Sequence, residues 1–289
     1  MTDRRGFLRA LAVTAMAPEV QAAPTQASRD PNSERSSRSP GESNRILPKN
    51  ANFPRMGYGC ASLVGWDNNP ISAEDFQKAE RAVHTALNCG INLFDHADIY
   101  AFGKAETLFG QILRRSPGLR SQIIIQSKCG QHFPAGWKPG DPVQINLSGE
   151  HIVSSVEGSL QRLNTDRLDM LLLHTPDALM HPVEVAQAFS ELKRSGKVRQ
   201  FGVSNHNAVQ IALLKQVVPE PLVANQIHIS LAYPYSLLDG MEFSLQLSKG
   251  LPGDEVGLAT SGPGTIDYCR SHGIQIQAWS PLQIGRAHV

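Results

Sequence analysis

The sequence predicts an α/β protein built as a (β/α)₈ TIM barrel, which is incomplete because only about seven of the eight βα units are present. Short apolar runs alternate with helical patterns from residue 54 onward, as expected for parallel strands joined by right-handed crossovers. Polar residues suited to chemistry end most of these runs, as at the carboxyl end of a barrel. No Gly-x-Gly-x-x-Gly follows any run, which disfavours the alternative, an open doubly wound sheet.

The first half of the body contains three expected strands and two expected helices. Ser72 is suited to cap the first helix, and Asp75, three residues later, to reach back in a capping box. This helix runs to Cys89, where Gly90 fits the stop. The strands are expected at 56–60, 92–95 and 122–128, and the second helix at 104–115.

The second half repeats the pattern. Residues 150–164 place apolar side chains on one helical face, and the apolar run at 168–174 closes on a histidine. Pro182 suits the start of the next helix, and Gly196 its stop. Further strands are expected at 198–203, 222–226 and 274–279, and further helices at 208–217 and 264–272.

Composition excludes several classes of protein. Apolar content of 41% and charged content of 18% are ordinary for a globular domain. The formal net charge of +1 gives no indication of a nucleic-acid partner. The four cysteines lie far apart, without a Cys-x-x-Cys pair, and no histidine cluster has metal-ligand spacing, so no metal site is predicted. The spacing of the cysteines neither requires nor excludes disulfide bonds.

The N-terminal region differs from the body. Residues 1–52 hold eight Lys/Arg against five Asp/Glu, and the remainder holds 19 against 21. Paired Arg4 and Arg5 before a short apolar stretch predict a twin-arginine signal peptide at 1–23, handled by the Tat export machinery, and hence a periplasmic or exported protein; a cytoplasmic protein is the alternative. The stretch is too short for a stable membrane anchor. Residues 24–52 are predicted to be a disordered linker before the barrel domain at 53–282.

The C-terminal residues 283–289 have an unusual coding interpretation. Residues 284–289, Ile-Gly-Arg-Ala-His-Val, are one translation of a widely used short-read sequencing adapter, and Gln283 is compatible with its preceding bases. We therefore expect this segment to be an artefact and the barrel to be truncated at about Leu282. A natural terminus here is the alternative; it would leave the seventh strand as an unpaired edge.

Four polar residues at or just after strand ends suggest an active site: Asp95, Tyr100, Lys128 and His174. A free phenol, with a pKa of about 10, exchanges protons poorly at neutral pH. A nearby Lys128 is expected to lower the pKa of Tyr100, while Asp95 keeps the ammonium charged. A neutral His174 would orient a carbonyl. Each residue alone is better explained by a structural role, but four at equivalent strand ends favour carbonyl reduction by a hydride donor.

Six segments resemble the aldo-keto reductase family, in the family's order and spacing, and they span nearly all of residues 56–282. Two stretches, His-Ala-Asp-Ile-Tyr and His-Thr-Pro-Asp, resemble most the bacterial oxidoreductase subgroup. The six segments are Phe94–Tyr100, Ser127–Gly130, Asp166–His174, Gly196–Asn205, Asn225–Gln226 and Ala278–Leu282.

The resemblance implies a role for each site residue. Tyr100 would donate the proton, Lys128 and Asp95 would adjust the acidity of Tyr100, and His174 would orient the substrate carbonyl. Other residues would hold the cofactor: Ser204, Asn205 and Gln226 at the nicotinamide carboxamide, Trp279 stacked on the nicotinamide ring, and Ser280 and Leu282 at the start of the loop over the pyrophosphate.

The implied function is NAD(P)H-dependent reduction of an aldehyde or ketone to an alcohol, with a small-molecule carbonyl substrate. The family's preference implies NADPH ahead of NADH, although the basic residues that select the 2′-phosphate follow the eighth strand. The alternative is a nicotinamide-binding redox sensor or regulatory subunit with little turnover, like the potassium-channel β subunits of the family. The intact four-residue set favours catalysis.

Two long loops are expected to leave the C-terminal face of the barrel and to shape substrate choice. Residues 131–149 contain Phe133 and Trp137, and residues 228–262 contain Tyr233 and Tyr235. These aromatic residues either line an apolar pocket or anchor the loops.

Overall fold

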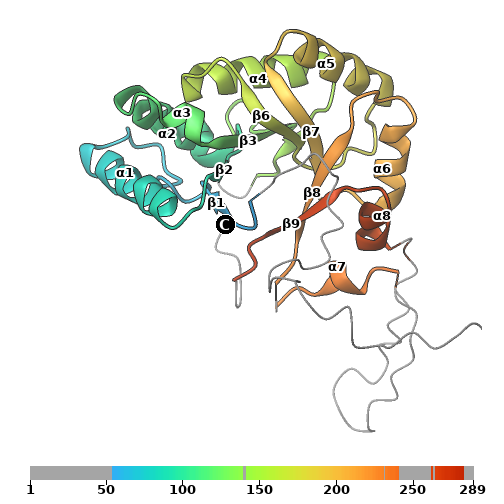
Figure 1. The fold of residues 1–289 in the computed structure, drawn as a ribbon. Helices are drawn as coiled ribbons and strands as arrows, with labels where there is room; N and C mark the ends of the chain where they lie inside the picture. The colour runs from blue at the N-terminus through green and yellow to red at the C-terminus, as the bar shows by residue number, and fades with distance from the viewer. Residues whose placement is uncertain (1–53, 139–140, 231, 241–261, 263, 283–289) are drawn as a thin grey trace, which may run out of the picture. The chain divides into compact units, whose positions relative to one another are not determined.

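A computed structural model describes residues 54–138, 141–230, 232–240, 262 and 264–282 (Figure 1). The predicted signal peptide, the predicted linker and the predicted adapter-derived segment lie outside the described residues, as does most of the second long loop. No helix within the described ranges is both long and apolar enough to cross a membrane.

Seven parallel strands form one curled sheet, a half-barrel, and so confirm the predicted fold class (Figure 1). Their spatial order is β1-β2-β3-β6-β7-β8-β9, so β1 and β9 are the two edges of the sheet in the described part of the chain. The strands are β1 (Gly57–Gly59), β2 (Leu93–Asp95), β3 (Ile124–Cys129), β6 (Leu168–Leu173), β7 (Val198–Ser204), β8 (Leu222–His228) and β9 (Gln275–Trp279).

The helices lie along the outer side of the curled sheet (Figure 1). Helices that follow one another around it pack together in the order α1, α2, α4, α5, α6 and α8. Their bounds are α1 (Ala73–Asn88), α2 (Lys104–Arg115), α4 (Gly149–Leu163), α5 (Pro182–Arg194), α6 (Ala208–Lys215) and α8 (Thr265–Ser271). Shorter elements are η2 (Tyr100–Gly103), α3 (Leu119–Gln122) and α7 (Tyr235–Leu238).

The strands of the main sheet and the long helices agree with the sequence-based expectation, whereas the short elements η2, α3 and α7 and the hairpin within residues 131–145 were not predicted. The predicted helix at 104–115 has the observed bounds of α2. The loop expected at 131–149 contains a small antiparallel hairpin, β4 (Gln131–His132) with β5 (Gln144–Ile145). Pairs of two residues carry no detectable hydrophobic period, so the sequence offered no signal for them.

The predicted capping box at the start of α1 is confirmed. The Asp75 backbone N–H donates to Ser72 Oγ at 3.1 Å, and the Ser72 N–H donates to Asp75 Oδ2 at 2.9 Å. Each side chain thus satisfies a backbone donor that the first helical turn leaves free.

The core has two layers, because the strands are covered on both faces. The outer layer packs strands against helices, as where Phe189 of α5 stacks on Phe201 of β7 at 4.1 Å between ring centroids. The inner layer inside the curl is small and includes Met170, Leu172 and Ala224. Gly202 of β7 is tightly enclosed there: a Cβ on it would lie 2.6 Å from the Ala224 carbonyl oxygen.

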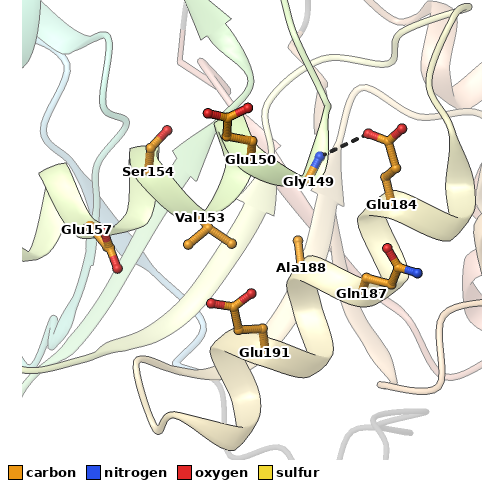
Figure 2. A pocket seen from close by; sticks show the side chains of 9 residues that line it. All are labelled: Gly149, Glu150, Val153, Ser154, Glu157, Glu184, Gln187, Ala188 and Glu191. Carbon is orange, nitrogen blue, oxygen red and sulfur yellow. Dashed lines mark hydrogen bonds between the residues drawn. The ribbon is translucent and has the colours of Figure 1, made fainter.

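A groove of about 560 Å³ runs between α4 and α5 (Figure 2). Its lining comes from these two helices and includes Glu150, Glu157, Glu184 and Glu191. Figure 2 shows the bond that joins them at one end, from the Gly149 N–H to Glu184 Oε2 at 3.3 Å. None of the predicted site residues lines this groove, so the candidate site lies elsewhere, at the carboxyl ends of the strands.

Candidate active site

Three neighbouring strands, β2, β3 and β6, and the short helix η2 bring the four predicted catalytic residues together. Asp95 ends β2, and Tyr100 opens η2, which follows it. Lys128 lies near the end of β3, and His174 directly follows β6. Because alternate residues of a strand point to one face, Asp95 and Lys128 both face the inside of the curl.

Lys128 is the centre of the arrangement. Its side chain is 1% exposed, and Nζ donates to both carboxylate oxygens of Asp95 at 2.8 Å each. The same nitrogen donates to the His96 carbonyl oxygen at 2.9 Å and lies 3.0 Å from the Tyr100 hydroxyl. Burial by itself disfavours the ammonium, but attraction to Asp95 and Tyr100 overcomes this and raises the pKa of Lys128 above its ordinary value.

The pKa of Tyr100 differs from the expectation. Burial raises it above its ordinary value, and this effect outweighs the lowering by Lys128, while Asp95 raises it further. The expected net lowering is therefore wrong for this structure, because the expectation counted the ammonium and left out the loss of water around the phenol. Tyr100 is held as a protonated phenol at neutral pH.

His174 approaches Tyr100 edge-on, with 5.9 Å between ring centroids and 81° between ring planes. Burial, with repulsion from Lys128, lowers the pKa of His174 to about 3. The imidazole is therefore neutral at neutral pH, as expected. A neutral ring carries one N–H, which suits it to donate a hydrogen bond to an uncharged oxygen.

The turn after Tyr100 has an unusual backbone. Ala101, Phe102 and Gly103 have φ values of 48°, 59° and 82°. Positive φ is costly for residues with a side chain, so this turn is held by its surroundings. It leaves Phe102 39% exposed beside the site.

Aromatic rings form a continuous wall next to Tyr100. Trp66 lies 6.3 Å from Tyr100 and 6.1 Å from Phe102, between ring centroids. Phe102 in turn lies 4.9 Å from Phe133 and 5.8 Å from Trp137. The last two belong to the first long loop, and the pocket interpretation of its aromatic residues stays a prediction.

The predicted cofactor residues gather at the ends of β7, β8 and β9. Ser204 Oγ donates to the Gln226 carbonyl oxygen at 2.8 Å. The Asn205 amide donates to the His174 carbonyl oxygen at 3.0 Å and accepts from Trp279 Nε1 at 2.9 Å. A hydroxyl, two amides and an indole in one place fit a flat ring that carries a carboxamide. Asn205 also connects this group to His174, the predicted carbonyl-orienting histidine.

Trp279 stacks on His228 in this structure, with 3.9 Å between centroids and 12° between planes. His228 stacks on Tyr233 of the second loop at 4.3 Å. The predicted stacking of Trp279 on nicotinamide stays a prediction. Ser280 and Leu282, just past β9, are exposed, and their predicted role at the pyrophosphate stays a prediction.

Sequence reasoning missed three polar residues that face the site: Gln126, Gln277 and His228. Gln126 Nε2 donates to Asp95 Oδ1 at 2.6 Å, and Gln226 Nε2 donates to Gln277 Oε1 at 3.1 Å. Each missed residue lies two positions from a predicted one on the same strand and so shares its face. That spacing was a usable signal.

A second buried polar group supports β3 from the outer side. Glu106 of α2 is completely buried, accepts from Ser127 Oγ at 2.6 Å and pairs with Arg162 at 2.8 Å. Nearby, burial and repulsion from Glu106 raise the pKa of Asp98 to about 7. This group fixes the position of the residue next to Lys128.

Comparisons with known proteins identify relatives of this chain. The sequence profile of the Aldo/keto reductase family matches residues 55–242. The oxidoreductase YcsN of Bacillus subtilis is 39% identical over 241 residues, covering 83% of this chain and 70% of the relative. The 6-dehydroglucose reductase of Novosphingobium aromaticivorans is 33% identical over 250 residues, covering 83% and 72% respectively.

A solved structure shares the fold. The holo form of the aldo-keto reductase AKR11C1 from Bacillus halodurans superimposes with a TM-score of 0.56 at 26% identity. The match covers 76% of this chain and 60% of that protein, so this chain spans less than two thirds of its length. On the profile match and the relatives together, the chain belongs to the aldo/keto reductase family of oxidoreductases, whose members use nicotinamide cofactors.

Proposed function

We propose that the protein reduces an aldehyde or ketone to an alcohol, with NADPH as the preferred cofactor. One observation carries the proposal: the Tyr100 hydroxyl lies 3.0 Å from Lys128 Nζ, and that nitrogen pairs with both oxygens of Asp95. This is a protonated acid beside a fixed positive charge. The cofactor, when bound, supplies a hydride to the carbonyl carbon.

Tyr100 supplies the other half of the reduction. Its phenolic proton goes to the carbonyl oxygen, and the phenolate left behind is stabilised by Lys128. Asp95 keeps that lysine charged and in place, and water returns a proton to Tyr100. Neutral His174 donates a hydrogen bond to the same carbonyl oxygen and thereby fixes its position.

The substrate side of the site suits a carbonyl compound with an apolar or flat face. The wall of Trp66, Phe102 and Phe133 offers ring faces and few hydrogen-bonding groups. Trp66 Nε1 is already used, because it donates to the Ala61 carbonyl oxygen at 2.7 Å. The wall therefore supports binding through ring contact beside the polar carbonyl-binding end.

The cofactor side is supported by the donors at the ends of β7 and β8. Ser204 and Asn205 would hold the carboxamide, with Gln226 completing the set. No residue within the described ranges settles the choice of dinucleotide, so the preference for NADPH rests on the family resemblance.

The test is cofactor oxidation with a panel of aromatic, aliphatic and sugar-derived carbonyl compounds, with NADPH and NADH in parallel. We expect Tyr100→Phe to lower kcat/KM by about 10²–10⁴-fold, the usual contribution of a positioned general acid. The matched control is Tyr268→Phe, which removes a hydroxyl from the outer helix α8 and should keep full activity.

Wild-type turnover no faster than that of Tyr100→Phe would overturn the proposal. Tight NADPH binding without turnover would instead support the alternative, a redox-sensing subunit.

A further inference from the structure

Two glutamines that the mechanism does not use, Gln126 and Gln277, lie inside the curled sheet. Gln126 is on β3, two residues before Lys128, and Gln277 is on β9, two residues before Trp279. Both side chains therefore share a face with a predicted functional residue. The two strands do not pair with each other, so only the curl of the sheet brings these amides together.

Their hydrogen bonds form an unbroken chain between the two halves of the site. Gln126 Nε2 donates to Asp95 Oδ1 at 2.6 Å and to Gln277 Oε1 at 2.9 Å. Gln277 Nε2 returns a bond to Gln126 Oε1 at 3.0 Å. Gln226 Nε2 donates to Gln277 Oε1 at 3.1 Å. The chain thus runs from the partner of the catalytic lysine to a predicted cofactor residue.

The charge of Asp95 sets the direction of this chain. An ionised carboxylate only accepts hydrogen bonds, so the NH₂ end of Gln126 must face it. The reciprocal pair then orients Gln277, whose oxygen must accept from Gln226. Gln126 is completely buried, and a buried amide is costly unless it is paired. The hydrogen bonds from Gln126 to Asp95 and between Gln126 and Gln277 therefore require the NH₂ group of Gln226 to point toward Gln277 Oε1.

We propose that Gln126 and Gln277 are positioning residues that connect the proton-donating half of the site to the cofactor half. The Gln126 amide shares the charge of Asp95, and the chain fixes which end of the Gln226 amide is presented to the cofactor. The second part rests on the proposed function, because it takes Gln226 as a cofactor residue; the first part does not.

The first part is tested by titrating Tyr100 without cofactor. Asp95 raises the pKa of Tyr100. On the proposal, the Gln126 N–H weakens that effect by sharing the charge of Asp95. Gln126→Met keeps the side-chain length but removes the donor. We expect it to raise the Tyr100 titration midpoint by about half a pH unit or more. Gln126→Glu keeps the shape and adds a like charge, so its shift should be larger in the same direction.

Tyrosinate absorbance in the ultraviolet, taken as the difference from a Tyr100→Phe background, isolates this group. The matched control is Gln275→Met, on the same strand and face as Gln277, because the Gln275 amide oxygen is buried without a hydrogen-bond partner. The control should titrate like wild type. Two Gln126 variants are used in case one of them does not fold. The shift in the Tyr100 midpoint is then measured on the variant that shows a cooperative unfolding transition.

The second part is tested by NADPH titration, followed by quenching of protein fluorescence. We expect Gln126→Met and Gln277→Met each to weaken NADPH binding, on the order of tenfold, since either breaks the chain. The double variant should bind no more weakly than the worse single variant, because both changes disrupt one unit. Gln275→Met should bind like wild type.

Two results would overturn the proposal: a Tyr100 midpoint unchanged in both Gln126 variants, or losses in NADPH affinity that add independently in the double variant. Failure of the proposed function has a different signature. A protein without carbonyl turnover still reports the Tyr100 midpoint, because that titration requires neither cofactor nor substrate.

Discussion

At the residue scale, the site depends on which buried groups carry charge. Lys128 stays charged because Asp95 pairs with it through both oxygens. His96, His174 and His206 have no comparable partner, and burial lowers their pKa values to about 3, about 3 and about 4. They are therefore neutral in the folded protein.

Because these three histidines are neutral in the folded protein, we expect the protein to become less stable as the pH falls. Between about pH 4 and 6.5 each binds a proton only when the chain is unfolded, so their contribution is present above the ordinary histidine pKa and is lost as the pH falls. Asp98 acts in the opposite direction: its pKa of about 7 means that the folded state holds a proton that the unfolded state has released. On unfolding in this window, the three histidines gain a proton each and Asp98 loses one, a net uptake of two protons. We therefore expect the free energy of unfolding to fall by roughly 3 kcal/mol for each unit by which the pH is lowered.

Urea unfolding at several pH values from 4.5 to 6.5 measures this slope. Asp98→Asn removes the opposing proton and should steepen the slope to roughly 4 kcal/mol per pH unit. A free energy of unfolding that does not change with pH in this range would contradict the assignment of neutral histidines.

At the element scale, the outer helices are held in place by close backbone contact. Gly110 of α2 faces the C-terminal end of α4, and a Cβ on it would lie 2.1 Å from the Arg162 carbonyl oxygen. The same two helices contribute Glu106 and Arg162, whose 2.8 Å ion pair supports Ser127. The close packing of α2 against α4 therefore helps to fix the position of Ser127, and with it β3.

We expect Gly110→Ala to destabilise the protein by about 1–3 kcal/mol, because the added methyl must push two packed helices apart. Gly59→Ala, on β1, is the control, because a Cβ on Gly59 would have nothing within 4 Å. That change should be neutral or stabilising by up to about 1 kcal/mol, since alanine restricts the unfolded chain more than glycine does. Thermal or urea unfolding distinguishes them, and equal effects would refute the contact argument.

At the scale of the whole molecule, the half-barrel places the proposed cofactor residues at or just after the ends of β7, β8 and β9. It places the proposed catalytic residues on β2, η2 and β3 and directly after β6. A ligand that contacts both sets would join the two ends of the curled sheet. Such a ligand binds the folded state alone and so stabilises it.

We therefore expect NADPH at about 100 times its Kd to stabilise the protein by about 2.7 kcal/mol, and to raise Tm by roughly 5–10 °C. Calorimetry or thermal unfolding with increasing NADPH measures the shift. Adenosine monophosphate at the same concentration is the control, since it lacks the nicotinamide that Ser204 and Asn205 are proposed to hold. No shift with NADPH would contradict the proposed cofactor site.

The sequence by itself determined the alternation of strands and helices, the cap formed by Ser72 and Asp75, and the placement of Asp95, Lys128 and His174 at strand ends. These are local properties, because hydrophobic period and capping act over a few residues. The tertiary structure decided the rest. It brought Gln126 opposite Gln277, 151 residues away, stacked Trp279 on His228, and buried Tyr100 enough to reverse the expected direction of its pKa. These features depend on how far the sheet curls and how much water it excludes, which no local pattern encodes.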